Sequence, residues 1–302
     1  MLSREEFTDA IFDELRQQLP QDYILSRKEV LKANDTPYTA INMTREGSDV
    51  GVVIYAENLY KEYEQGSTVE EIAERASDAV KEKNLQRDEL PVFDKQFILD
   101  HTYYRMANAG MNQRRFEHVP VYSPPGAEDI ALYPCVDVVI DGRNGVITLS
   151  DSQIADLDIS MDELRDAALA NTERRVEIVP LGQVLSEMMP GIEPEMFDSP
   201  FYVSRDKEMA GGVSGASLFG APSVISQMHG DYYIIPSSVH EVLLLPKDFE
   251  TDPDKLHSLV HEVNTEVLDP EDFLSDHVYE SRNGVISTLE SDVGAEQHIE
   301  RE

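Results

Sequence analysis

The stretch that decides the fold class is YILSRKEVLKANDTPYTAINMTREGSDVGVVIY, residues 23–55. β-branched and aromatic side chains gather there in three strand-like runs, at residues 23–31, 38–44 and 50–55. Asn34-Asp35 separates the first two runs and Glu46-Gly47-Ser48-Asp49 separates the last two, and both connections have the composition of hairpin turns. Because short connections join antiparallel strands, we predict a β-meander rather than part of a parallel sheet.

Amphipathic helices flank this meander. Ser3 and Glu6 form a capping box, and apolar residues then recur at helical spacing, at Phe7, Ile11, Leu15 and Leu19. After the meander, Ser67 or Thr68 begins a second helix with an apolar stripe over residues 69–80. We therefore assign residues 1–88 to an N-terminal helix–β-meander–helix module, with its boundary in the stretch 86–91.

We assign residues 89–288 to a main domain and residues 289–302 to a flexible acidic tail. Helical patterns follow Ser160, cover residues 181–189 and 217–228, and begin again at Asp252 or Asp254 with a stripe of Leu256, Val260, Val263 and Val267. Strand-like runs lie between them, including 102–107, 232–235, 239–245, 277–280 and a hairpin through Asn144-Gly145. Because strands and helices alternate irregularly, we predict an α+β fold with mixed or antiparallel sheets flanked by amphipathic helices.

The composition limits the partners. The chain of 302 residues carries 59 acidic and 25 basic side chains, a formal net charge of −34, yet 41% of it is hydrophobic, enough for a buried core. Such a charge repels phosphate and anionic lipid, so we expect no direct binding to nucleic acid or membranes. Cys135 is the only cysteine, and no apolar run is long enough to span a membrane, so we expect a cytoplasmic protein.

Three segments carry a family resemblance: YYIIPSSVHEVLLLP at 232–246, HEVN at 261–264 and PEDFLSDHVY at 270–279. With looser matches upstream that extend over most of the chain, they resemble the DUF5688 family of gut Firmicutes. Proteins of that family are described only as containing a domain of unknown function. The resemblance therefore implies kinship and assigns no activity, cofactor or catalytic residue.

The densest polar cluster contains Ser237, Ser238 and His240, with Asp276 and His277 downstream. One interpretation is a hydrolase, in which Ser238 or Ser237 is the nucleophile, His240 or His277 the base, and Asp276 the group that orients it. The chain has no Gly-x-Ser-x-Gly elbow, and serines at a strand-to-strand corner satisfy backbone groups without catalysis. We favour the turn interpretation and assign no catalytic residue.

Two other patterns are weaker. His257 and His261 are four residues apart on one helical face, a spacing at which two imidazoles can share a metal, but no third ligand has a diagnostic spacing. The glycine-rich run 211–217 precedes a predicted helix but lacks the Gly-Lys-Ser/Thr ending of a phosphate-binding loop. We expect no metal and no cofactor.

Three hypotheses from different classes follow. The first is a non-catalytic interaction or accessory protein from a mobile element, whose partner is another protein with a basic surface. The second is a nucleic-acid mimic that inhibits a DNA- or RNA-binding protein, motivated by the charge of −34. The third is a hydrolase centred on Ser238 and His240.

Overall fold

The computed structural model describes residues 1–47, 51–82, 93–140, 143–189, 191, 193, 196–197, 199–207, 218–228, 230–249 and 251–290. The chain divides into two compact units. Unit 1 contains Met1–Lys32, Thr36–Val92 and Val138–Gly145, and unit 2 contains Ala33–Asp35, Phe93–Asp137 and Val146–Glu302. The boundary stretch 86–91, the glycine-rich run 211–217 and residues 291–302 of the predicted tail lie outside the described residues.

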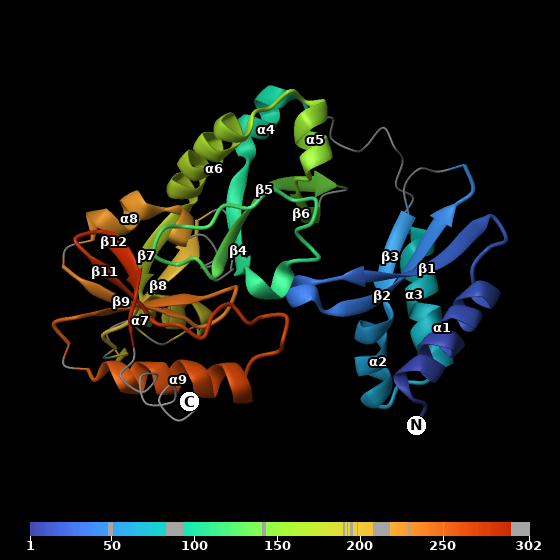
Figure 1. Ribbon diagram of the computed structural model, residues 1–302. Helices are drawn as coiled ribbons and strands as arrows, with labels where there is room; N and C mark the ends of the chain where they lie inside the picture. Colours follow the sequence, from blue (N-terminus) through green and yellow to red (C-terminus); the bar gives the residue numbers. More distant parts are fainter. Residues whose placement is uncertain are drawn as a thin grey trace, which may run out of the picture. The chain divides into compact units, whose positions relative to one another are not determined.

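Unit 1 is built on the predicted meander. Its elements are α1 (Arg4–Gln18), β1 (Tyr23–Leu31), β2 (Pro37–Arg45), β3 (Gly51–Tyr55), α2 (Ala56–Glu64) and α3 (Val69–Glu82) (Figure 1). Within the described residues the sheet has the order β1-β2-β3, and both pairings are antiparallel. The capping box of Ser3 and Glu6 is confirmed, and Thr68 and Glu71 exchange the same pair of hydrogen bonds ahead of α3. Helix α2 was not predicted, because it follows β3 directly and has no side-chain cap.

One face of this sheet is covered by the three helices. Phe7, Ile11 and Leu15 of α1 lie in the same core as Ile41 and Met43 of β2, together with Ile72, Ala73 and Val80 of α3. Ile41 and Met43 alternate with the less buried Asn42 and Thr44, while Tyr38 and Ala40 are buried on the opposite face of the strand. Burial of these apolar side chains is the main stabilising contribution to unit 1.

The remaining strands form two more antiparallel sheets. One contains β4 (Tyr103–Asn108), β5 (Ile130–Ile140) and β6 (Arg143–Thr148) in that order. The other has the order β12-β11-β9-β10-β8-β7 among the described residues, with bounds β7 Val176–Pro180, β8 Tyr202–Asp206, β9 Tyr232–Pro236, β10 Val242–Pro246, β11 Tyr279–Arg282 and β12 Val285–Thr288. Three antiparallel sheets combined with helices confirm the predicted α+β class.

Helices cover these sheets. Their bounds are α4 Lys95–His101, α5 Asp151–Asp156, α6 Met161–Arg175, α7 Leu181–Met188, α8 Pro222–Gln227 and α9 Pro253–Glu266. The all-apolar strands β9 and β10 are buried on both faces: Ile234 and Leu244 contribute to one core, and Ile235 and Leu245 to another beneath α9. Short 3-10 turns occupy Ala33–Asp35, Gly110–Asn112 and Leu218–Gly220.

Several predicted elements were wrong in detail. Asn144 and Gly145 lie inside β6, so the connection from β5 falls at residues 141–142, which are outside the described residues. The helix predicted over 217–228 begins only at Pro222, whose ring is suited to a first helical turn. Val267 is not a core residue: it is the C-cap of α9 and is 73% exposed. Within the described residues no helix is long and apolar enough to cross a membrane.

Candidate functional site

Ser237, Ser238 and His240 lie in the connection from β9 to β10. The Ser238 Oγ accepts hydrogen bonds from the backbone N–H groups of His240, at 3.0 Å, and Glu241, at 3.1 Å. The backbone N–H groups of both serines are bonded to the carbonyl of Glu241. These are the bonds of a serine-stabilised turn, and the hydroxyl has no hydrogen bond to a side chain within the described residues. The geometry therefore gives Ser238 no activating base.

The two candidate histidines pair with different carboxylates. The Nε2 of His240 lies 3.1 Å from Oδ1 of Asp272, and the Nδ1 of His277 lies 3.1 Å from Oδ2 of Asp129. Asp276, the expected orienting group, instead accepts a hydrogen bond of 2.8 Å from the Nδ2 of Asn264. The structure thus does not unite His240, His277 and Asp276 in one site.

Asp129 is the centre of a polar cluster that sequence reasoning missed. Its carboxylate accepts hydrogen bonds of 2.6 Å from Ser275 Oγ and from Tyr279 OH, in addition to the contact with His277. Burial alone would raise the pKa of Asp129, but these donors hold it below its ordinary value. Burial and the same carboxylate raise the pKa of Tyr279, which therefore stays a donor. No local pattern could have identified Asp129, because it lies 148 positions from His277.

This cluster orients His277 but supplies no nucleophile. Asp129 bonds the Nδ1 of the half-exposed ring, and Ser275 lies beside the same nitrogen, at 3.4 Å. In a catalytic triad the serine is bonded to the opposite nitrogen, Nε2, from the one that the carboxylate holds. Ser275 is fully buried and bonded to Asp129, so its chemistry is that of a structural donor.

His257 and His261 both lie in α9, but their surroundings differ. The Nε2 of His257 is buried without a hydrogen-bond partner, and this burial lowers the pKa of His257, so the ring stays neutral near pH 7. His261 is exposed. The part of the chain that the structure describes contains no group of three or more histidine, cysteine, aspartate or glutamate residues placed to hold a metal ion.

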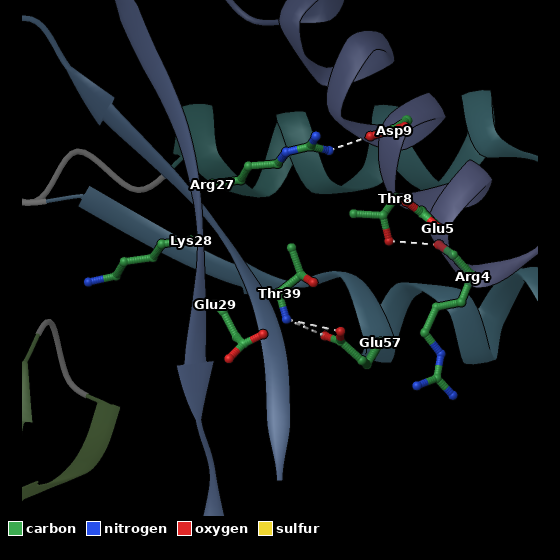
Figure 2. A pocket seen from close by; sticks show the side chains of 9 residues that line it. All are labelled: Arg4, Glu5, Thr8, Asp9, Arg27, Lys28, Glu29, Thr39 and Glu57. Atoms are coloured by element: carbon green, nitrogen blue, oxygen red, sulfur yellow. Dashed lines mark hydrogen bonds and ion pairs between the residues drawn. The ribbon is translucent and has the colours of Figure 1, made fainter. Parts of the chain in front are cut away.

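Unit 1 contains a polar cavity of about 580 Å³ at the helix-covered face of its sheet. It is lined by Arg4, Glu5, Thr8 and Asp9 of α1, by Arg27, Lys28 and Glu29 of β1, by Thr39 of β2 and by Glu57 of α2 (Figure 2). The cavity lies where the apolar packing under α1 gives way to charged residues along β1. Sequence reasoning missed it, because charged residues on a helix and an outer strand are also typical of an ordinary solvated surface.

The charged groups of this cavity are not all neutralised. Arg27 forms an ion pair with Asp9, and both carboxylate oxygens of Glu57 accept the backbone N–H of Thr39 at 2.9 Å. Lys28 points to the opposite side of β1 from Arg27 and Glu29 (Figure 2). Arg4, which lines the cavity, has its guanidinium carbon 6.0 Å from the centroid of the Tyr60 ring, and Tyr60 is not part of the lining.

Among the described residues Glu29, like Glu5 of α1, is an unpaired carboxylate of this cavity. Its carboxylate has no hydrogen-bond or ion-pair partner among the described residues, and Figure 2 shows it on the same side of β1 as Thr39 and Glu57. Glu29 and Glu57 thus lie on the same side of β1, and neither carboxylate forms an ion pair with a described lysine or arginine. The arrangement suits a positively charged group that arrives from outside.

The comparisons with known proteins identify kin but no activity. Residues 4–282 match the model of a family described as "Family of unknown function (DUF5688)". The chain belongs to the DUF5688 family. Neither the curated proteins nor the solved structures gave a match. Because DUF5688 carries no described activity, no residue of this chain inherits a role from it.

Proposed function

We propose that this protein is a non-catalytic interaction protein, whose unit 1 cavity takes a lysine or arginine side chain from an extended segment of a partner protein. The observation that carries the proposal is the unpaired carboxylate of Glu29, beside Glu57, in a cavity of about 580 Å³. The Glu29 side chain is exposed, so an arriving cation can reach its carboxylate and bind it through charge-assisted hydrogen bonds. Glu29 and Glu57 together can accept several such bonds from one ammonium or guanidinium group.

Two other ligand classes fit less well. A metal ion needs a closer set of ligands than the described carboxylates provide. Small-molecule pockets have a similar volume, about 300–1,000 Å³, but are lined mostly by apolar and aromatic side chains. The described lining is charged or hydroxylic at every position, which suits a charged polypeptide segment better than a drug-like molecule.

The charge of the whole chain supports the same partner. At a net charge of −34, the protein attracts basic surfaces over several ångströms and repels phosphate. Long-range attraction raises association rates, while the cavity supplies the local contacts. We place this interaction in the cytoplasm, with no direct binding to nucleic acid or to membranes.

The test uses short synthetic peptides with free ends blocked. One set carries a single lysine or arginine in a serine–threonine background, and the matched set carries glutamate at that position. We expect the basic peptides to bind and the acidic ones not to bind in isothermal titration. Glu29→Gln combined with Glu57→Gln should weaken binding by about tenfold or more, since a hydrogen bond to a charged group contributes about 1.5–3 kcal/mol net, and the low end applies at this exposed site.

The control variant is Glu70→Gln combined with Glu74→Gln, which also removes two negative charges, from exposed positions of α3 outside the cavity lining. It should change affinity less than about twofold, because only the long-range field changes. Equal weakening by the control and the cavity variant would assign the effect to net charge and overturn the proposal. Binding of basic and acidic peptides alike would also overturn it.

The other two hypotheses gain no specific support. The hydrolase needs a base at Ser238, whose hydroxyl is bonded to backbone N–H groups of its own turn. The nucleic-acid mimic stays a prediction: it requires rows of carboxylates that a DNA- or RNA-binding groove accepts as phosphates. If duplex DNA displaces this protein from every basic protein that binds it, the mimic hypothesis is favoured over the peptide cavity.

A further inference from the structure

The outer edge of β1 has no strand partner among the residues that the structure describes. Within the described residues β1 is an outer strand of its sheet and pairs only with β2, in a continuous register that places Arg27 opposite Ile41 and Glu29 opposite Thr39. At the two ends of this pairing, the N–H of Lys32 is bonded to the carbonyl of Thr36, and the N–H of Glu46 to the carbonyl of Asp22.

These end bonds fix which residues face outward. In an antiparallel pair, hydrogen-bonded positions alternate with non-bonded ones. On the β1 side, the residues of these end bonds are Asp22 and Lys32, which are both even-numbered. Because the register between them is unbroken, the even-numbered residues Ser26 and Lys28 are also hydrogen-bonded to β2. The N–H and carbonyl groups of Leu25, Arg27 and Glu29 therefore point away from β2 along the free edge.

The same odd-numbered residues direct their side chains toward the helices. Leu25 packs against the core of unit 1, Arg27 pairs with Asp9 of α1, and Glu29 lines the cavity. Residues directly opposite one another in a sheet direct their side chains to the same face. A residue paired with Glu29 from outside would therefore direct its own side chain toward the cavity.

We propose that the partner segment binds as an added antiparallel strand along β1, with a lysine or arginine opposite Glu29. This inference rests on the proposed function and specifies its register. Opposite-charge pairing then favours an acidic residue opposite Lys28, and apolar pairing favours an aliphatic residue opposite Leu25. Arg27 is already paired with Asp9, so a small uncharged hydroxyl residue suits the position opposite it. Read from its N-terminus, the segment is basic, acidic, serine or threonine, any residue, aliphatic. Backbone bonds supply affinity in this mode, and the cavity supplies specificity.

A second copy of this chain is the competing occupant. Two β1 strands could pair about Lys28, which would place Arg27 of each opposite Glu29 of the other. That pairing also sets the two copies of Lys28 directly opposite each other, which is unfavourable, and brings together two chains of net charge −34. A basic segment of a different protein meets neither penalty.

The experiment uses the full chain and the blocked peptide SKETSVS, which follows the inferred pattern, with the reversed sequence SVSTEKS as the matched control. Two further peptides carry one backbone N-methyl group, on the threonine whose N–H would face Arg27, or on the glutamate whose N–H would point away. We expect methylation of the threonine to weaken binding about tenfold, and methylation of the glutamate to change it less than about twofold.

Hydrogen exchange provides the second readout. On binding SKETSVS, the amide hydrogens of Arg27 and Glu29 should exchange at least about tenfold more slowly, while that of Lys28, already bonded within the sheet, should change little. If SKETSVS binds and depends on Glu29, but both methylated peptides bind alike, the cavity proposal stands and strand addition is overturned. If no basic peptide binds, both are overturned. A concentration-dependent dimer of the chain alone, with Arg27 and Glu29 protected, identifies a second copy as the occupant and also overturns this inference.

Discussion

Replacement of Asp129 by alanine is the sharpest stability test of unit 2. The carboxylate accepts bonds of 2.6 Å from Ser275 and Tyr279, both 0% exposed, and a third of 3.1 Å from His277. Hydrogen bonds to a charged group contribute about 1.5–3 kcal/mol each. The Asp129 side chain is 27% exposed, so each bond from the two buried donors, Ser275 and Tyr279, contributes about 1.5 kcal/mol, the low end of this range. The bond from the exposed His277 adds little to the free energy of unfolding.

Part of this loss is recovered in the variant. The Ser275 and Tyr279 oxygens lie 2.9 Å apart, so one hydroxyl can donate to the other after Asp129 is removed. One buried donor then remains without an acceptor, which costs about 1–3 kcal/mol. We therefore expect Asp129→Ala to lower the free energy of unfolding by about 3 kcal/mol, measured by urea denaturation with circular dichroism. Hydrogen exchange of the β11 amides assigns the change to unit 2.

Asp276→Ala is the control, since its exposed carboxylate accepts from Asn264 alone of the described side chains. It should cost less than about 1 kcal/mol. The pH dependence gives an independent check. Because the pKa of Asp129 is lowered in the folded state, its stabilisation is present above the ordinary value of 3.8 and is lost as pH falls through the folded pKa. If Asp129→Ala lowers the free energy of unfolding by less than about 1 kcal/mol, the reasoning is refuted. It is also refuted if Asp129→Asn loses stability at acidic pH in the same way as the unsubstituted protein.

Three further predictions concern other positions. Gly126→Ala should lower the free energy of unfolding by about 2–4 kcal/mol in urea denaturation, because φ is +81° and an added Cβ would lie 2.1 Å from the Ile286 carbonyl oxygen. Gly230→Ala is the control: its φ is +98° but the added Cβ meets open space, so it should cost only about 1–2 kcal/mol. Glu241→Gln should raise the melting temperature at pH 7 but not at pH 4. Burial raises the pKa of Glu241, so its ionisation destabilises the folded state as pH rises; equal effects at both pH values would contradict this. Ser160→Ala should cost about 1 kcal/mol in thermal unfolding through loss of the α6 cap, and Ser160→Asp should restore most of it.

Local chemistry explains what the sequence could predict. The capping box at Ser3, the helix cap at Ser160 and the meander of unit 1 depend on residues within a few positions of one another, and the structure confirms all three. The Asn34-Asp35 turn also agrees, since both residues have positive φ, a conformation that asparagine and aspartate tolerate. The predicted Asn144-Gly145 turn is wrong, because both residues lie inside β6.

Long-range pairing explains what the sequence could not predict. His277 contacts Asp129, and His240 contacts Asp272, because distant segments of the chain pack together. No rule of sequence spacing connects the two members of either pair. The unit 1 cavity was missed for a different reason. Arg27 and Glu29 have the ordinary composition of an outer strand, and only the register of β1 on β2 shows that both side chains face α1.

The most direct test of the central claim is to map where a lysine-containing segment binds. Amide spectra of the isotopically labelled chain should be recorded during titration with SKETSVS. The account predicts shifts concentrated at Arg27, Glu29, Thr39 and Glu57, around the unit 1 cavity, with the β11 amides of unit 2 unchanged. Shifts centred on Asp129 and His277, or spread evenly over acidic surfaces of both units, would contradict it.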